Sequence, residues 1–113
     1  MNVRIQEQSL KFKITHSELG DLLKGQKVQS ALNLPQANFR VCILPCGTIN
    51  ELQVRMTSEK GGDVMSLIAP QRLLQKLQDL GRNRDGVTGQ FGNVRLTLQV
   101  DYRKEKNTIK QIK

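Results

Sequence analysis

The sequence predicts an α+β domain in which a mostly antiparallel, curved sheet of about six to eight strands carries two helices on one face, in the order ββα-ββββ-α-ββ. Three observations lead to this prediction. Apolar and polar residues alternate along most of the 113 residues, which is the period of a half-buried strand. Two short stretches carry apolar residues at helical spacing instead. Glycine-containing turns separate several of the strands, which favours antiparallel neighbours.

Residues 2–14 predict a β-hairpin. Alternation places Val3 and Ile5 on one face of the first strand, and Leu10 and Phe12 on one face of the second. A turn near residues 7–8 sets Val3 opposite Phe12 and Ile5 opposite Leu10. Because Glu-Gln is a poor choice for a tight turn, we expect a loop longer than two residues.

The same register sets Arg4 opposite Lys11 on the outer face of this hairpin. Like charges that face each other directly are mildly destabilising. Two explanations fit: basic residues protect an exposed strand edge from pairing with other chains, or the face binds an anion. We favour edge protection, and the sequence leaves both explanations open.

A capped helix follows the hairpin. The Thr15 hydroxyl can accept a hydrogen bond from the Glu18 N–H while the Glu18 carboxylate accepts from the Thr15 N–H, which is a capping box. The helix stripe consists of Leu19, Leu22 and Leu23, and Gly25 is suited to end the helix. A helix this short is unstable alone, so it must pack on the preceding strand.

The middle of the chain predicts four successive strands, near 27–33, 39–44, 52–57 and 64–68, joined by turns into an antiparallel meander. A second helix starts at Pro70 and ends at Gly81. The strand near 64–68 and the helix after it repeat the strand–helix order of residues 9–25. This similarity is either a weak internal repeat or the presence of two ordinary strand–helix units in one α+β domain. The clearest strand is the last, over 94–103.

Length and charge bound the organisation. We expect one domain over residues 1–103 and a flexible basic tail over 104–113. The chain has a formal charge of +8, and residues 103–113 hold five basic residues and one acidic residue. Such a tail is typical of a solvated chain end, which is the explanation we favour, and of a segment that meets a polyanion.

No pattern of catalytic or metal-binding residues stands out. Cys42 and Cys46 form a lone C-x₃-C, and zinc would need two further ligands, whereas His16 is the single histidine. We expect both cysteines to be buried structural thiols. The carboxylates show no paired-acid spacing, so the sequence predicts no enzyme, no metal and no cofactor.

A basic, glycine-rich connection spans residues 81–93. Its glycines could let backbone N–H groups approach phosphate, but it matches no phosphate-loop motif, and an ordinary connection is the favoured interpretation. If the protein binds nucleic acid, the expected residues are Arg82, Arg84, Arg95, Arg103, Lys104 and Lys106. Phe91 is the single aromatic residue that we expect to be exposed for base stacking.

The opening residues resemble a family of small, uncharacterised bacterial proteins. The matching positions are Val3-Arg4-Ile5, Ser9-Leu10-Lys11, Ile14-Thr15, Glu18-Leu19 and Gly25, with Ser66 to Pro70 at a second strand-to-helix junction and, more loosely, Val100-Asp101-Tyr102. These are capping and packing residues, so the resemblance implies a shared fold. It implies no activity.

The sequence therefore favours a small cytoplasmic domain that binds a protein partner and has no catalytic activity. The alternative is a nucleic-acid or polyanion binder that uses the basic residues named above. The short N-terminus lacks a signal-like apolar segment, no stretch is long enough to cross a membrane, and two cysteines suit a reducing compartment. The sequence leaves open whether the chain forms a homo-oligomer.

Overall fold

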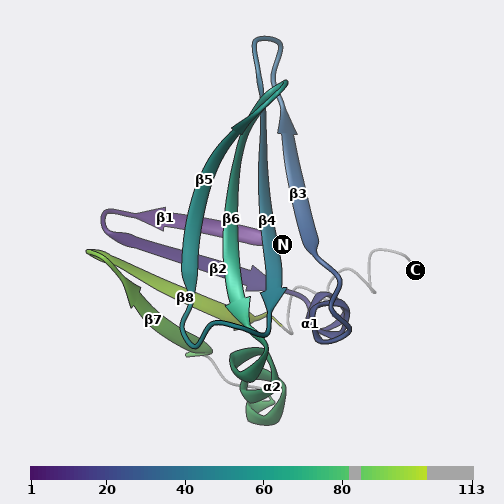
Figure 1. Ribbon diagram of the computed structural model, residues 1–113, viewed down its shortest axis with the longest axis vertical. Helices are drawn as coiled ribbons and strands as arrows, with labels where there is room; N and C mark the ends of the chain where they lie inside the picture. Colours follow the sequence, from purple (N-terminus) through teal and green to yellow (C-terminus); the bar gives the residue numbers. More distant parts are fainter. Residues whose placement is uncertain (82–84, 102–113) are drawn as a thin grey trace.

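The computed structural model describes residues 1–81 and 85–101, which form eight strands and two helices (Figure 1). In chain order they are β1 (Asn2–Gln6), β2 (Ser9–Ile14), α1 (His16–Leu23), β3 (Val28–Asn33), β4 (Asn38–Cys46), β5 (Gln53–Glu59), β6 (Gly62–Pro70), α2 (Gln71–Leu80), β7 (Val87–Phe91) and β8 (Val94–Val100). The α+β class and the element order are confirmed. Neither of these helices is long and apolar enough to cross a membrane. The predicted tail, 104–113, lies outside the described residues.

The strands form two four-stranded sheets, where the sequence had predicted one curved sheet. Sheet A has the order β1-β2-β8-β7, and sheet B has the order β3-β4-β6-β5. Their apolar faces share one buried core, because side chains such as Phe12 and Leu98 of sheet A and Ile43 and Leu67 of sheet B belong to a single cluster. Sheet A therefore covers the lower half of the apolar face of sheet B, and the two helices lie together at the end of sheet B where β4 and β6 finish (Figure 1).

The N-terminal hairpin has the predicted register. Val3 pairs with Phe12, Arg4 with Lys11 and Ile5 with Leu10. The expectation of a longer loop is wrong, because Gln6 pairs with Ser9 and two residues alone form the turn. The first of them, Glu7, takes a positive φ of 47°.

Sheet B is not the predicted antiparallel meander. The strand β6 lies between β4 and β5, parallel to β4 and antiparallel to β5. Burial explains this order. In β6 four consecutive residues, from Val64 to Leu67, are buried, so both faces of the strand need cover. In β5 the residues from Arg55 to Glu59 are exposed, so this strand fits at an edge.

The weak repeat in the sequence corresponds to a repeat of topology. Residues 2–46 form a ββαββ unit and residues 53–100 form another. Each unit gives one hairpin to each sheet, and in each sheet the second strands of the two hairpins pair in parallel, β2 with β8 and β4 with β6. The first unit gives its first hairpin to sheet A and its second hairpin to sheet B, and the second unit does the reverse. Strands that are distant in sequence therefore become neighbours in each sheet.

Local contacts confirm the predicted start of α1. The Glu18 N–H donates to Thr15 Oγ1 at 3.1 Å, and the Thr15 N–H donates to Glu18 Oε1 at 2.9 Å. The other carboxylate oxygen, Oε2, accepts from the amino group of Met1 at 3.1 Å. The capping box therefore also ties the beginning of β1 to the helix.

The two hairpins of sheet B meet closely at Gly62. A Cβ atom there would lie 1.8 Å from the backbone oxygen of Asn38, and the φ of Gly62 is 153°. The Asn38 N–H donates to the Gly61 oxygen at 3.1 Å. Only glycine fits at this crossing, because any side chain would overlap backbone atoms.

Candidate functional site

The outer face of sheet A carries basic and uncharged polar side chains. Because side chains alternate along strands, the residues opposite the core-facing set share this face. They are Asn2, Arg4 and Gln6 of β1, Ser9, Lys11 and Lys13 of β2, Arg95, Thr97 and Gln99 of β8, and Thr88 and Gln90 of β7. The face therefore holds four cations and no carboxylate. The nearest acidic residues in the chain are Glu7, in the turn, and Asp101, directly after β8. We call these eleven residues the basic face.

Strand pairing brings the four cations close together. Arg4 lies directly opposite Lys11, and Lys13 is two residues further along the same strand. Arg95 lies opposite Ser9, which is two residues before Lys11. Neighbouring strands are about 4.8 Å apart, and residues two apart on one strand are about 6.6 Å apart. The distances between the cations are therefore comparable to the distances between successive charges along an extended ligand.

The basic face is exposed along β1 and β7 and at Arg95, whereas Thr97 at its centre is buried. Its charges are not neutralised by ion pairs within the described residues. Arg4 and Arg95 are exposed, and Lys11 and Lys13 are half-buried. The ion pairs found in residues 1–81 and 85–101 join Met1 to Glu18 and Arg40 to Glu59, and neither involves a residue of this face. Like charges held side by side raise the local potential and attract an anion.

The predicted ligand set is only partly placed. Arg95 lies on the basic face. The other predicted residues, Arg82, Arg84, Arg103, Lys104 and Lys106, lie outside the described residues. Arg4, Lys11 and Lys13 were absent from the predicted set. The alternation had already placed Arg4 and Lys11 on one outer face, but only the parallel pairing of β2 with β8 adds Arg95 to them.

Aromatic side chains are absent from the basic face. Phe12 is fully buried on the opposite face of sheet A, and Phe39 belongs to sheet B. Phe91 is 40% exposed, as predicted, but it follows Val87 and Gly89 on the core-facing side of β7. Base stacking on this face is therefore not supported, and contact with phosphates is the recognition that its side chains can provide.

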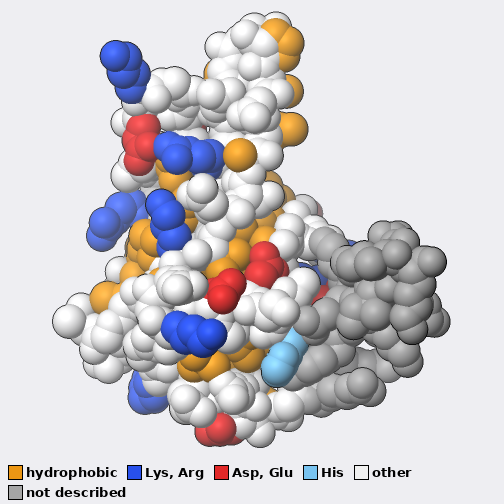
Figure 2. Space-filling view, turned by 90° about the vertical axis from the view of Figure 1, so that its right-hand side faces the viewer, with side chains coloured by type: hydrophobic (Ala, Val, Ile, Leu, Met, Phe, Trp, Pro, Cys, Tyr) orange, Lys and Arg blue, Asp and Glu red, His pale blue; other side chains and the backbone are white. Residues whose placement is uncertain are grey.

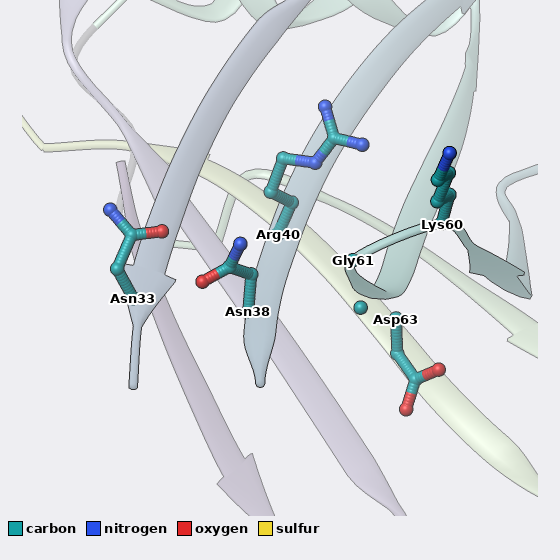
Figure 3. A pocket seen from close by; sticks show the side chains of 7 residues that line it. Asn33, Asn38, Arg40, Lys60, Gly61 and Asp63 are labelled. Carbon is teal, nitrogen blue, oxygen red and sulfur yellow. The ribbon is translucent and has the colours of Figure 1, made fainter. Parts of the chain in front are cut away.

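A polar pocket of about 320 Å³ lies between the hairpin tips of sheet B (Figure 3). Figure 3 shows Arg40 and Lys60 extending to one side and Asp63 to the other. Arg40 pairs with Glu59, and Asp63 Oδ1 accepts from Ser58 Oγ at 3.0 Å. Arg40 is therefore neutralised by Glu59, and a second carboxylate, that of Asp63, lines the pocket, so this pocket is a weaker anion site than the basic face.

The two cysteines differ in their surroundings. Both are free thiols, and Cys42 is buried as predicted, whereas Cys46 is only half-buried. The Thr48 hydroxyl lies 3.2 Å from Cys46 Sγ. Its hydrogen bond, with backbone hydrogen bonds from Thr48 and Ile49, lowers the pKa of Cys46, while partial desolvation opposes the effect. No group of three metal-binding side chains occurs in the described part of the chain.

Comparison with known proteins gives a family and no function. No curated protein and no solved structure matches the chain. A family model matches residues 1–108, which is most of the sequence. The resemblance to an uncharacterised family is thereby confirmed, and the chain belongs to the family of unknown function DUF7009.

Proposed function

We propose that this protein is a binding domain without catalytic activity that holds nucleic acid by its phosphates on the basic face of sheet A. One observation carries the proposal: Arg4, Lys11, Lys13 and Arg95 come from three adjacent strands and share a face without a carboxylate. A sheet surface of this kind offers several cations at once to an extended polyanion, and each phosphate neutralised releases bound counterions.

The composition of the basic face limits what is recognised. Its uncharged side chains, among them Asn2, Ser9 and Thr88, can donate hydrogen bonds to phosphate oxygens. It has no aromatic side chain on which a base could stack. Binding should therefore depend on salt and on the number of phosphates, with little dependence on base sequence. The formal charge of +8 favours the same class of ligand.

The cellular setting that we propose is the reducing cytoplasm. Cys42 and Cys46 are too far apart on β4 to bridge each other, and a chain with only two cysteines has no disulfide framework, which suits such a compartment. Recognition of a protein partner is favoured by a separate feature, the exposed edge strand β3 of sheet B.

The test is binding of labelled single- and double-stranded oligonucleotides, followed by fluorescence anisotropy between 50 and 200 mM salt. Four cations predict log–log slopes of about −2.8 for single strands and about −3.6 for duplex, so affinity should fall by about 50- to 150-fold. The double variant Arg4→Gln/Lys11→Gln should halve the slope and reduce that fall to about 7- to 12-fold.

The matched control is Lys60→Gln/Lys76→Gln, which removes the same charge from a turn of sheet B and from α2. It should keep the wild-type slope. A third variant, Lys104→Gln/Lys106→Gln, measures the contribution of the predicted tail residues. The proposal fails if the wild-type chain does not bind at 50 mM salt. It also fails if the control weakens binding as much as the change in Arg4 and Lys11, because net charge alone would then explain the result.

A further inference from the structure

The edge strand β3 is open and carries no charge. Of its six residues Val28 is buried, and the residues from Gln29 to Asn33 are exposed. The whole stretch 28–39 lacks Lys, Arg, Asp and Glu, although a quarter of the chain is charged. An uncharged edge presents unpaired backbone N–H and C=O groups that a further strand can pair with.

The other three edges are less suited to pairing. In β1 the central residue is Arg4, and β5 contains Arg55 and Glu59. Charged side chains on an edge discourage pairing with another chain. The edge strand β7 is uncharged but shorter, with Gly89 at its centre packed against Leu52. The edge that combines length, exposure and lack of charge is therefore β3.

An apolar surface adjoins this edge. On the core-facing side of sheet B, Leu32 is 56% exposed and lies opposite Phe39. Met56, 59% exposed, lies on the same face but on β5, at the far edge of the sheet. Leu34, just after β3, is 50% exposed. Figure 1 shows the reason: sheet A crosses behind only the lower half of sheet B, so the upper half of that face has no cover. In Figure 2 the projecting hairpin shows hydrophobic atoms and no charged atoms at its tip.

We propose that a second copy of this chain pairs with β3, antiparallel, to form a dimer with a continuous eight-stranded sheet. Such a pair has a two-fold axis perpendicular to sheet B, so directly opposed residues lie on the same face. We place the axis at Ser30, which faces Ser30 of the partner subunit. Val28 then lies opposite Leu32 of the partner subunit, and the reverse pair also forms, so apolar side chains meet twice.

The arrangement of the two sheets favours a second copy as the occupant. Because the paired strands run in opposite directions, sheet A of each copy lies beside the uncovered upper half of the other copy, on the same side of the joined sheet. In the proposed dimer this position would cover Leu32, which is 56% exposed in the single chain. The charge of +8 opposes association of two copies, and the uncharged edge at β3 is the place on the described surface where this repulsion is weakest.

The test is the mass in solution, measured by light scattering during size-exclusion chromatography at about 10 to 200 μM protein without nucleic acid. The wild-type chain should approach twice 12.8 kDa as concentration rises. Ala31→Lys should weaken self-association by about tenfold or more, because it places a cation on the pairing edge. Thr57→Lys is the matched control, since Ala31 and Thr57 occupy the same row and face of sheet B on opposite edges. It should leave the dimer unchanged.

A crosslink tests the register. In a Cys46→Ser background, Ser30→Cys should form an intermolecular disulfide on oxidation, because opposed Cα atoms at 4.5–5.5 Å lie within disulfide range. Thr57→Cys in the same background should not. Circular dichroism confirms that each variant is folded. A monomer at every concentration overturns the proposal, as does a dimer that Ala31→Lys leaves intact. A dimer that Ser30→Cys fails to crosslink overturns the register.

Discussion

Replacing Phe12 with alanine should be among the most destabilising single changes in sheet A. The Phe12 side chain is fully buried, and it lies on the core-facing side between Val3 and Leu98 of the neighbouring strands. Both neighbours are held by strand pairing, so they cannot collapse into the space left behind. Removing a buried Phe in this way costs about 3 to 5 kcal/mol, and we expect the upper half of that range. A chain of 113 residues has a total stability of about 6 to 17 kcal/mol.

The assay is urea unfolding followed by circular dichroism, with the free energy of unfolding and the m-value fitted for each variant. The control is Phe91→Ala, which removes the same side chain from the same sheet at a position that is 40% exposed. Its partial burial predicts a cost of about 1 to 2 kcal/mol. If Phe12→Ala costs no more than Phe91→Ala, the shared core of the two sheets is not where the structure places it.

Two further predictions concern sheet B. Gly62→Ala should lower the free energy of unfolding by about 2 to 3 kcal/mol, because the added Cβ would overlap backbone atoms. The control is Gly47→Ala, which adds a Cβ in open space and should change the free energy of unfolding by less than about 0.5 kcal/mol. Equal effects of the two changes in urea unfolding would contradict the close approach of the two hairpins at Gly62. The lowered pKa of Cys46 means that its thiolate forms at lower pH, so a chromogenic disulfide reagent should modify it below the pH that an ordinary cysteine needs. Thr48→Val should shift the pH dependence of the reaction rate of Cys46 to higher pH. Buried Cys42 should react only when the protein unfolds. If Thr48→Val leaves the pH dependence unchanged, the Thr48 hydroxyl is not the cause of the lowered pKa.

Local patterns predicted much of the fold. The capping box of Thr15 and Glu18 and the pairing of Val3 with Phe12 depend on residues close in sequence, and both are confirmed. The order of the ten elements is confirmed as well. The prediction of an ordinary connection over 81–93 is wrong, because β7 lies inside that stretch, where Gly89 interrupts the apolar alternation that would have indicated a strand. The two-residue turn after β1 escaped prediction because the hairpin register overrides the weak turn preference of Glu7.

The candidate site likewise combines residues that a local pattern places and a residue that only the tertiary structure places. Period-two alternation is enough to place Arg4 and Lys11 together on an outer face. Arg95, more than eighty residues away, joins them only because β8 pairs in parallel with β2, and no local pattern encodes that choice. The remaining predicted ligands lie in segments that the structure does not describe.

By itself the sequence determined the approximate position of most strands and helices, which side of the apolar strands faces the core, and how the first hairpin is paired. The tertiary structure decided that there are two sheets, that β6 lies between β4 and β5, and that an uncovered edge remains at β3. The physical reason is that an apolar strand face specifies only that it must be buried. Its partner is chosen by the whole chain, as the arrangement that buries the most apolar surface with every central strand paired on both sides.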